Sequence, residues 1–278
     1  MMTMLITTIL NAKSKKKLTY DWNFIGSHPL EWSDEYAYED AQALLQLSLM
    51  TTAANSRDVS IGAPSWLQDT EVFYGVCPIP LLAEKTPPAL LAHVLYSPTS
   101  NIVFMVFTGT SNICMASLDL DYTQVEVEKL YNYEPGMKAH RGFYNAYVSV
   151  RDQLWNILDK YEKNINPKIF ITGHSLGGGL SQLCALDFAR YNPIHYSFAS
   201  PSVFNEKACG KFANIVSKSY RVANISDIVT SSPLAIMPNG DKFYHVGVLA
   251  AFQRNMDSLS ENHSLAYVTE YNIPYILS

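Results

Sequence analysis

The stretch ITGHSLGGGL, residues 171 to 180, places four glycines around a single serine, Ser175. Glycine tolerates sharp turns and close backbone approach, but it is costly inside a helix or a strand. The cluster therefore indicates a backbone that bends abruptly at the serine. An apolar run, KIFIT, comes before the stretch, and a helical pattern follows it to about residue 190. A strand, a tight turn and a helix are thus expected in immediate succession.

Patterns typical of strands and helices alternate on both sides of this turn. Strands are predicted at residues 92–97, 101–110, 168–172, 194–200 and 219–225, and helices at 34–53, 143–163, 176–190 and 205–217. A Pro- and Gly-rich segment, 60–88, predicts a loop that the short apolar run EVFYGV interrupts. The alternation favours an α/β fold, a mostly parallel central sheet with helices on both faces. We expect one domain over residues 1–278, with residues 1–20 as an N-terminal tail or extension.

The composition supports a sizeable core and argues against several function classes. Of the 278 residues, 48% are hydrophobic and 16% are charged, which argues against disorder. A formal net charge of −5 gives no reason to expect nucleic acid as a partner. The four cysteines form no C-x-x-C pair, so a metal site is not expected.

The N-terminus carries the apolar run MMTMLITTIL, followed by a basic stretch from Lys13 to Lys17. A secretion signal has its positive charge before the apolar run and a small-residue cleavage site after it. A bilayer span needs about 20 apolar residues. We therefore expect no cleaved signal and no transmembrane segment, and an intracellular (cytoplasmic) protein rather than a secreted one. Two N-x-S sequons, at Asn224 and Asn262, would matter only in a secretory compartment.

The pentapeptide Gly173-His174-Ser175-Leu176-Gly177 follows the pattern G-x-S-x-G. Between a buried strand and a helix, this pattern predicts a nucleophile elbow, which exposes the serine hydroxyl at a helix N-terminus. Backbone N–H groups at that end can stabilise negative charge. A Gly-rich structural turn is the alternative, and the strand–turn–helix setting favours the nucleophile.

A serine hydroxyl is a weak nucleophile until a base accepts its proton, so an acid and then a histidine are expected downstream. Asp227 follows a predicted strand and is the candidate acid. His245 and His263 are both candidate bases. His245 lies in the apolar run FYHVGVLAAF, which predicts a strand histidine packed near the core, and spacing favours His263, in the polar turn of SENHSLAYV. His174 is expected to point away from Ser175.

Five stretches, in this order, make the chain resemble the class 3 lipases, the family that includes secreted fungal triacylglycerol lipases. They are IVFMVFTGT, HRGFYNAY, ITGHSLGGGL, RVANISDIVTSSP and NHSLAY, and they span residues 102–267. The resemblance implies an α/β-hydrolase fold and a triad of Ser175, Asp227 and His263. It also implies that His245 falls on the family's non-catalytic strand histidine.

By the same resemblance, the oxyanion hole is formed by the backbone N–H groups of Thr110 and Leu176. The chain departs from the family pattern at Thr108, where arginine is usual, and at Ala199 and Phe204, where glycines are common. These departures put the supporting packing in question rather than the triad.

Residues 111–120, SNICMASLDL, match the family's lid region. Ile113, Met115 and Leu118 would give such a lid an apolar face. An ordinary surface helix with the same stripe is the alternative. An apolar lid favours acylglycerol or phospholipid, taken up at a lipid interface.

These features predict a serine carboxylesterase (EC 3.1.1.-) that hydrolyses lipid esters as triacylglycerol lipases do, through an acyl-enzyme and without a metal or organic cofactor. A phospholipase or a soluble-ester, feruloyl-type esterase is the alternative among enzymes. A catalytically silent hydrolase fold that binds lipid is the alternative outside them. The oligomeric state stays open.

Overall fold

The computed structural model describes residues 18–20, 31–55, 68–75, 89–109, 122–233, 237, 239–273 and 275–277. Thr110 and the predicted lid residues Ile113, Met115 and Leu118 lie outside the described residues. The predicted tail also lies outside them up to residue 17.

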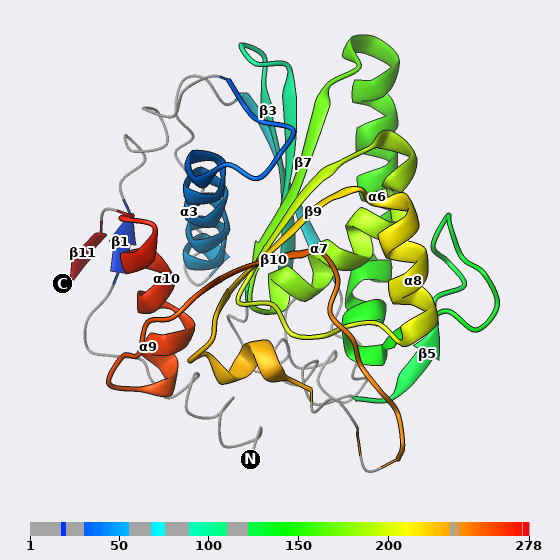
Figure 1. Ribbon diagram of the computed structural model, residues 1–278. Coiled ribbons are helices and arrows are strands. Elements are labelled where there is room, and N and C mark those ends of the chain that lie inside the picture. The colour runs from blue at the N-terminus through cyan, green and yellow to red at the C-terminus, as the bar shows by residue number, and fades with distance from the viewer. Residues whose placement is uncertain are drawn as a thin grey trace.

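A seven-stranded sheet runs through the described part of the chain (Figure 1), in the order β10-β9-β8-β7-β4-β3-β2. The strands are β2 Gln68–Gly75, β3 Ala89–Ser97, β4 Ile102–Phe107, β7 Lys168–His174, β8 Ile194–Phe198, β9 Lys218–Asn224 and β10 Val248–Phe252. The neighbouring strands from β10 to β4 in this order pair in parallel. The strand β3 pairs antiparallel with β4, and β2 pairs antiparallel with β3. The mostly parallel sheet is confirmed. The run EVFYGV, which interrupts the loop predicted over 60–88, belongs largely to the outermost strand β2.

Helices cover both faces of this sheet (Figure 1). On one face lie α3 Tyr38–Asn55 and α10 Leu265–Glu270, and on the other lie α6 Arg141–Ile165, α7 Leu176–Asp187 and α8 Glu206–Ile215. Two short strand pairs lie outside this sheet: β1 Leu18–Tyr20 pairs with β11 Tyr275–Leu277, and β5 Gln124–Glu126 pairs with β6 Lys138–His140. The short helices are the 3-10 helices η1 Ala189–Tyr191 and η2 Ile228–Ser231, and the α-helix α9 Leu259–His263.

The strand β4, with the sequence IVFMVF, shows why a layer is needed on each face. All six of its side chains are buried. The odd-numbered side chains belong to the apolar cluster beneath α6, α7 and α8, and the even-numbered ones to the cluster beneath α3. Because side chains alternate across a strand, an all-apolar strand must be covered on both sides.

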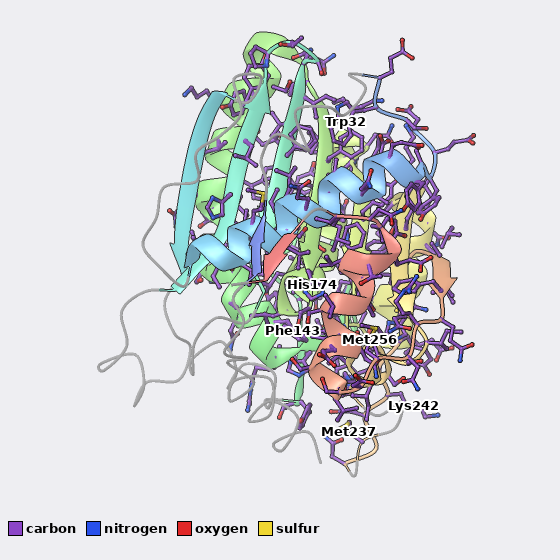
Figure 2. All side chains as sticks on the ribbon, turned by 90° about the vertical axis from the view of Figure 1, so that its left-hand side faces the viewer. Trp32, Phe143, His174, Met237, Lys242 and Met256 are labelled. Carbon is purple, nitrogen blue, oxygen red and sulfur yellow. The ribbon has the colours of Figure 1, made fainter. Side chains whose placement is uncertain are left out.

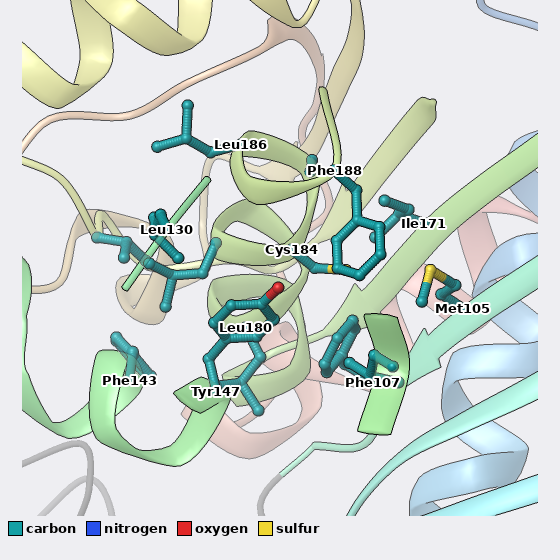
Figure 3. Packing of buried hydrophobic residues seen from close by; sticks show 14 of the residues in the cluster. Met105, Phe107, Leu130, Phe143, Tyr147, Ile171, Leu180, Cys184, Leu186 and Phe188 are labelled. Carbon is teal, nitrogen blue, oxygen red and sulfur yellow. The ribbon is translucent and has the colours of Figure 1, made fainter. Parts of the chain in front are cut away.

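The helix α7 packs between α6 and the sheet (Figure 3). Leu180 and Cys184 of α7, with Phe188 just after it, lie beside Tyr147 of α6 and Phe107 of β4. These five side chains are all buried, and the rings of Phe107 and Tyr147 have their centroids 6.3 Å apart. The helix that follows the serine is therefore held along its length by apolar contacts on two sides.

A buried carboxylate, Asp187, holds the C-terminal end of α7. It accepts hydrogen bonds from three side chains of α6, at 2.7 Å from Tyr147 Oη, 2.8 Å from Arg151 Nε and 2.8 Å from Trp155 Nε1. It also accepts the backbone N–H of Tyr131 at 2.5 Å. A buried charge is costly unless it is paired and hydrogen-bonded, and Asp187 satisfies both conditions. It therefore ties α7 to α6 and to the loop before α6.

Three buried histidines, His93, His174 and His195, are neutral in the folded protein. Burial lowers the pKa of His93 to about 4 and the pKa of His195 to about 3. Burial, helped by the neighbouring ring of His263, lowers the pKa of His174 to about 3. Protons therefore bind these rings more readily in the unfolded chain than in the folded one.

We predict that the free energy of unfolding falls steeply when the pH drops from about 7.5 to about 5.5. Below about pH 6.5 the unfolded chain takes up protons that the folded rings refuse, so acid favours unfolding. Each ring lowers the free energy of unfolding by up to about 1.4 kcal/mol per pH unit, or about 4 kcal/mol for the three together at pH 5.5. Urea unfolding at the two pH values measures this. His195→Gln should remove about 1.4 kcal/mol of the difference, and a midpoint that does not move with pH would contradict the prediction.

Candidate functional site

The backbone at Ser175 adopts the sharp bend that the glycine-rich stretch indicates. Ser175 has φ 61° and ψ −124°, a conformation that residues with a side chain rarely adopt. It stands between β7 and α7, and its N–H donates to the carbonyl oxygen of Phe198 on β8 at 2.9 Å. The expected order of strand, turn and helix is confirmed.

Two of the surrounding glycines are required because other backbone atoms take the space of a side chain. A Cβ atom on Gly173 would lie 2.3 Å from the carbonyl of Gly177, and one on Gly177 would lie 2.3 Å from the carbonyl oxygen of Phe107. Real Cβ atoms do not come that close to another atom. The turn is therefore pressed directly against the end of β4, at the carboxyl edge of the sheet.

The elbow meets two side chains that come from other segments. Nε2 of His263 lies 2.7 Å from Oγ of Ser175, and Nδ1 of His263 lies 2.8 Å from Oδ2 of Asp227. Because a carboxylate only accepts hydrogen bonds, Nδ1 carries the proton, and Nε2 accepts the hydroxyl proton of Ser175. Asp227 is the N-cap of η2, shortly after β9, and His263 ends α9. The structure thus brings the three predicted residues into one hydrogen-bonded row.

Asp227 is 1% exposed, and donors meet both of its oxygens. Oδ1 accepts the N–H of Val229 at 3.0 Å, and Oδ2 accepts the hydroxyl of Tyr267 at 3.0 Å in addition to the ring of His263. The Tyr267 oxygen in turn accepts the N–H of Asn224 at 3.0 Å. Burial and the charge of Asp227 raise the pKa of Tyr267 well above its usual value, so the hydroxyl keeps its proton. Tyr267 was not predicted from the sequence, in which its one signal is a polar hydroxyl on a residue of a short apolar helix.

His174 packs against the ring of His263 and forms a hydrogen bond with its backbone. Its Nε2 donates to the backbone carbonyl of His263 at 2.9 Å, and the two rings have their centroids 5.0 Å apart. Figure 2 places His174 between α3 and the C-terminal helices. Because Nε2 donates to a carbonyl, this nitrogen carries a proton, and the lowered pKa leaves the ring neutral, with its hydrogen bond directed away from the hydroxyl of Ser175.

His245 does not lie in a strand, and the prediction of a strand histidine is wrong. The strand β10 begins at Val248, because Gly247 with φ 84° interrupts the extended backbone before it. Nε2 of His245 lies 2.7 Å from the carbonyl oxygen of Thr230 and 3.2 Å from Oγ of Ser202. Burial lowers the pKa of His245 to about 4. The ring therefore anchors the segment after η2.

Two buried asparagines join the segment of the acid to the segment of the base. Nδ2 of Asn224 donates to the carbonyl oxygens of Asn262, at 3.1 Å, and Arg254, at 2.8 Å. Oδ1 of Asn262 accepts the N–H of Met256 at 2.7 Å. Both asparagines belong to N-x-S sequons, and both are internal in the folded protein.

Two of the three departures from the family pattern have local explanations, and nothing in the structure explains the third, Ala199. The hydroxyl of Thr108 donates to the carbonyl of Leu90 at 2.7 Å, which fastens the end of β4 to β3. Phe204 is fully buried and forms a bridge with Tyr244. Ala199 has φ 51°, the left-handed region in which glycine is less strained.

Of the two predicted oxyanion donors, the structure describes Leu176, which begins α7 and is 1% exposed. Its N–H belongs to the first turn, where N–H groups have no acceptor within the helix. Thr110 and the lid residues lie outside the described residues, so the second donor and the lid stay predictions.

Two features are absent from the described residues. No group of three His, Cys, Asp or Glu side chains there could hold a metal ion. None of the helices there combines the length and apolar character that a membrane span requires.

Comparison with known proteins shows that part of the chain is similar to lipases. The family model "Lipase (class 3)" matches residues 104–237. A lipase of Rhizomucor miehei is 31% identical over 170 residues, which are 56% of this chain and 43% of that protein. A secreted mono- and diacylglycerol lipase of Malassezia globosa is 33% identical over 135 residues, which are 45% of this chain and 43% of that protein. The chain thus spans less than half the length of these curated relatives.

Solved lipase structures share the fold. A triacylglycerol lipase reported to have a serine protease triad as its catalytic centre is 26% identical, with a TM-score of 0.58, over 76% of this chain and 80% of that chain. The mono- and diacylglycerol lipase of Aspergillus oryzae is 21% identical, with a TM-score of 0.58, over 87% of each chain. The α/β-hydrolase fold implied by the sequence resemblance is confirmed.

We predict that Tyr267→Phe lowers the free energy of unfolding by about 3 kcal/mol, because it leaves the N–H of Asn224 without an acceptor and removes a donor to a buried carboxylate. Tyr271→Phe is the matched control, since Tyr271 is also buried but, among the described residues, its hydroxyl bonds only to the exposed Tyr36, at 2.8 Å. That variant should lose about 1 kcal/mol. Urea unfolding of both measures the difference, and equal losses would show that the link to Asp227 adds nothing.

Proposed function

We propose that the protein is a serine carboxylesterase that hydrolyses lipid esters, and the match of residues 104–237 to the class 3 lipase family supports this proposal. The observation that carries the proposal is the row of hydrogen bonds from Asp227 through His263 to Ser175. A nucleophile, a base and an orienting acid in this order are the requirements of covalent catalysis through an acyl-enzyme. The complete row also counts against a catalytically silent fold that only binds lipid.

In the proposed reaction, Oγ of Ser175 attacks the ester carbonyl carbon while Nε2 of His263 takes the hydroxyl proton. The tetrahedral intermediate then expels the alcohol, which receives this proton, and the acyl group stays on Ser175. Water attacks the acyl-enzyme with His263 again as the base, and the carboxylic acid leaves. Asp227 holds Nδ1 in its protonated form and stabilises the imidazolium.

The negative charge on the carbonyl oxygen requires donors that are already in place. The N–H of Leu176 supplies one, at the start of α7, where the helix dipole also favours negative charge. Thr110 is proposed to supply the second, on the family resemblance alone. This scheme requires neither a metal nor an organic cofactor.

We predict that Ser175→Ala and His263→Ala each lower kcat on a p-nitrophenyl ester by about a millionfold, because the two residues act as one unit. Asp227→Ala should lower it by about 10⁴-fold, since Asp227 orients the base without exchanging the proton. His245→Ala, at the loop anchor, is the control and should keep most of its activity. Steady-state kinetics, with circular dichroism to verify folding, measure these values. Loss of turnover in the His245 variant, with turnover retained in the His263 variant, would reverse the assignment of the base.

We further propose that the substrate is an acylglycerol, taken up at a lipid surface. The apolar residues Ile113, Met115 and Leu118, in the stretch that matches the family's lid, support this choice. Two of the similar proteins are named mono- and diacylglycerol lipases and a third a triacylglycerol lipase. A panel of p-nitrophenyl esters, triacylglycerols and phospholipids tests it, and a preference for phospholipid or for dissolved ester would replace the acylglycerol.

We predict that activity rises sharply when a short-chain ester passes its solubility limit. Opening an apolar lid in water would expose about 200 Å² of apolar surface, at a free-energy cost of about 5 kcal/mol. Contact with a lipid surface would offset this cost. Replacing Ile113 and Leu118 with serine should therefore raise activity on dissolved ester and lower it on emulsions. Rate curves across the solubility limit measure both effects. Smooth saturation in the wild type, unchanged by the substitutions, would favour a soluble-ester hydrolase.

A further inference from the structure

Three hydroxyl residues lie toward the C-terminal end of α3: Ser48, Thr51 and Thr52. Each donates to a carbonyl about one turn earlier, Ser48 to Leu44 at 2.8 Å, and Thr51 and Thr52 both to Ser48, at 2.9 Å and 2.8 Å. Such bonds satisfy a hydroxyl within its own helix and need no further role. Thr52 differs from Thr51 because its Oγ1 also accepts the backbone N–H of Gly109, at 2.7 Å.

Gly109 lies where the chain leaves the sheet beside the elbow. The strand β4 ends at Phe107, and the N–H of Thr108 still donates to β3, at 3.0 Å. Gly109 comes directly after this last bond to the sheet, and its N–H is held by Thr52. A Cβ atom on Gly109 would lie 3.2 Å from Oγ1 of Thr52 and 3.3 Å from the carbonyl oxygen of His174. Gly109 is therefore fitted between α3 and the residue that precedes the nucleophile.

The peptide unit that follows Gly109 carries the N–H of Thr110, the oxyanion donor predicted from the sequence. Such a donor is worth about 10² to 10³ in kcat, and it must be held to within about 0.5 Å of its productive position. The Thr52 hydroxyl is itself held by its bond to Ser48. It therefore fixes the backbone of Gly109, the residue directly before the predicted donor.

We propose that Thr52 is a positioning residue for ester hydrolysis, which acts through the backbone of Gly109 rather than by contact with the substrate. The proposal rests on the proposed function. It assigns to α3, on the face of the sheet opposite α7, a part in holding the oxyanion side of the site.

The test compares Thr52→Val with Thr51→Val in hydrolysis of p-nitrophenyl butyrate. Both variants lose a hydroxyl that donates to Ser48, but only Thr52→Val removes the acceptor of the Gly109 N–H. We expect kcat to fall about 10- to 100-fold in Thr52→Val, with KM changed by less than about twofold. Thr51→Val should stay within about twofold of the wild type, and Thr52→Ser, which keeps the hydroxyl, should restore kcat to within about threefold.

A second measurement separates positioning from a loss of stability. An alkylboronic acid forms a tetrahedral anion on the serine and resembles the transition state, so its affinity should fall in Thr52→Val by about the same factor as kcat. Thermal unfolding should show Thr52→Val to be destabilised somewhat more than Thr51→Val, because it leaves the N–H of Gly109 without an acceptor, so both kcat values are measured well below the two unfolding midpoints. If Thr52→Val does not fold, Thr52→Ala replaces it with the same expectation.

The outcomes distinguish this proposal from the one it rests on. Equal kcat and equal boronate affinity in Thr52→Val and Thr51→Val would overturn the role of Thr52 and leave the proposed function in place. Hydrolysis by the wild type that survives Ser175→Ala would overturn both.

Discussion

The site depends on the close approach of three backbone segments at one point, where the end of β7, the first turn of α7 and the end of β4 meet. The carbonyl of Phe107 occupies the place that a side chain on residue 177 would need. Ser175 is held there in a sparsely populated backbone conformation, which costs on the order of 1–3 kcal/mol. The rest of α7 opposes this strain, through apolar contacts with α6 and the sheet and through the buried carboxylate of Asp187 at its far end.

The acid and the base reach Ser175 from the region that follows β9. Asn224 is the last residue of β9, and its side chain and N–H are bonded to the segments around Arg254, Asn262 and Tyr267. These contacts hold the segments of Asp227 and His263 together, and the row of hydrogen bonds from Asp227 through His263 to Ser175 is complete in this structure. Functional groups gather in this way at the carboxyl ends of parallel strands because several chain segments leave the sheet there together.

The features that depend on residues close together in the sequence could be predicted from it. The continuous apolar run of β4 indicates two covering layers, and the glycines around Ser175 indicate the turn. Spacing alone favours His263 over His245 only slightly, and the strand that the apolar run around His245 predicts does not include His245, because Gly247 interrupts the extended backbone. Tyr267 and Thr52 were missed because their roles come from contacts between distant segments, which no periodicity encodes. The domain extent, the lid, Thr110 and the intracellular location stay predictions.

The buried position of Asn224 has a consequence for how the protein can be produced. Its side chain is 0% exposed and its amide nitrogen donates to two carbonyl oxygens, yet the sequence Asn224-Ile225-Ser226 is an acceptor for a glycan. A glycan is attached to a chain that has not yet folded, and at this position the finished fold has no room for it. In a host that glycosylates exported proteins, modification and folding would therefore compete for the same asparagine. Ser226→Ala would remove the acceptor sequence and leave every contact of the Asn224 side-chain amide nitrogen in place.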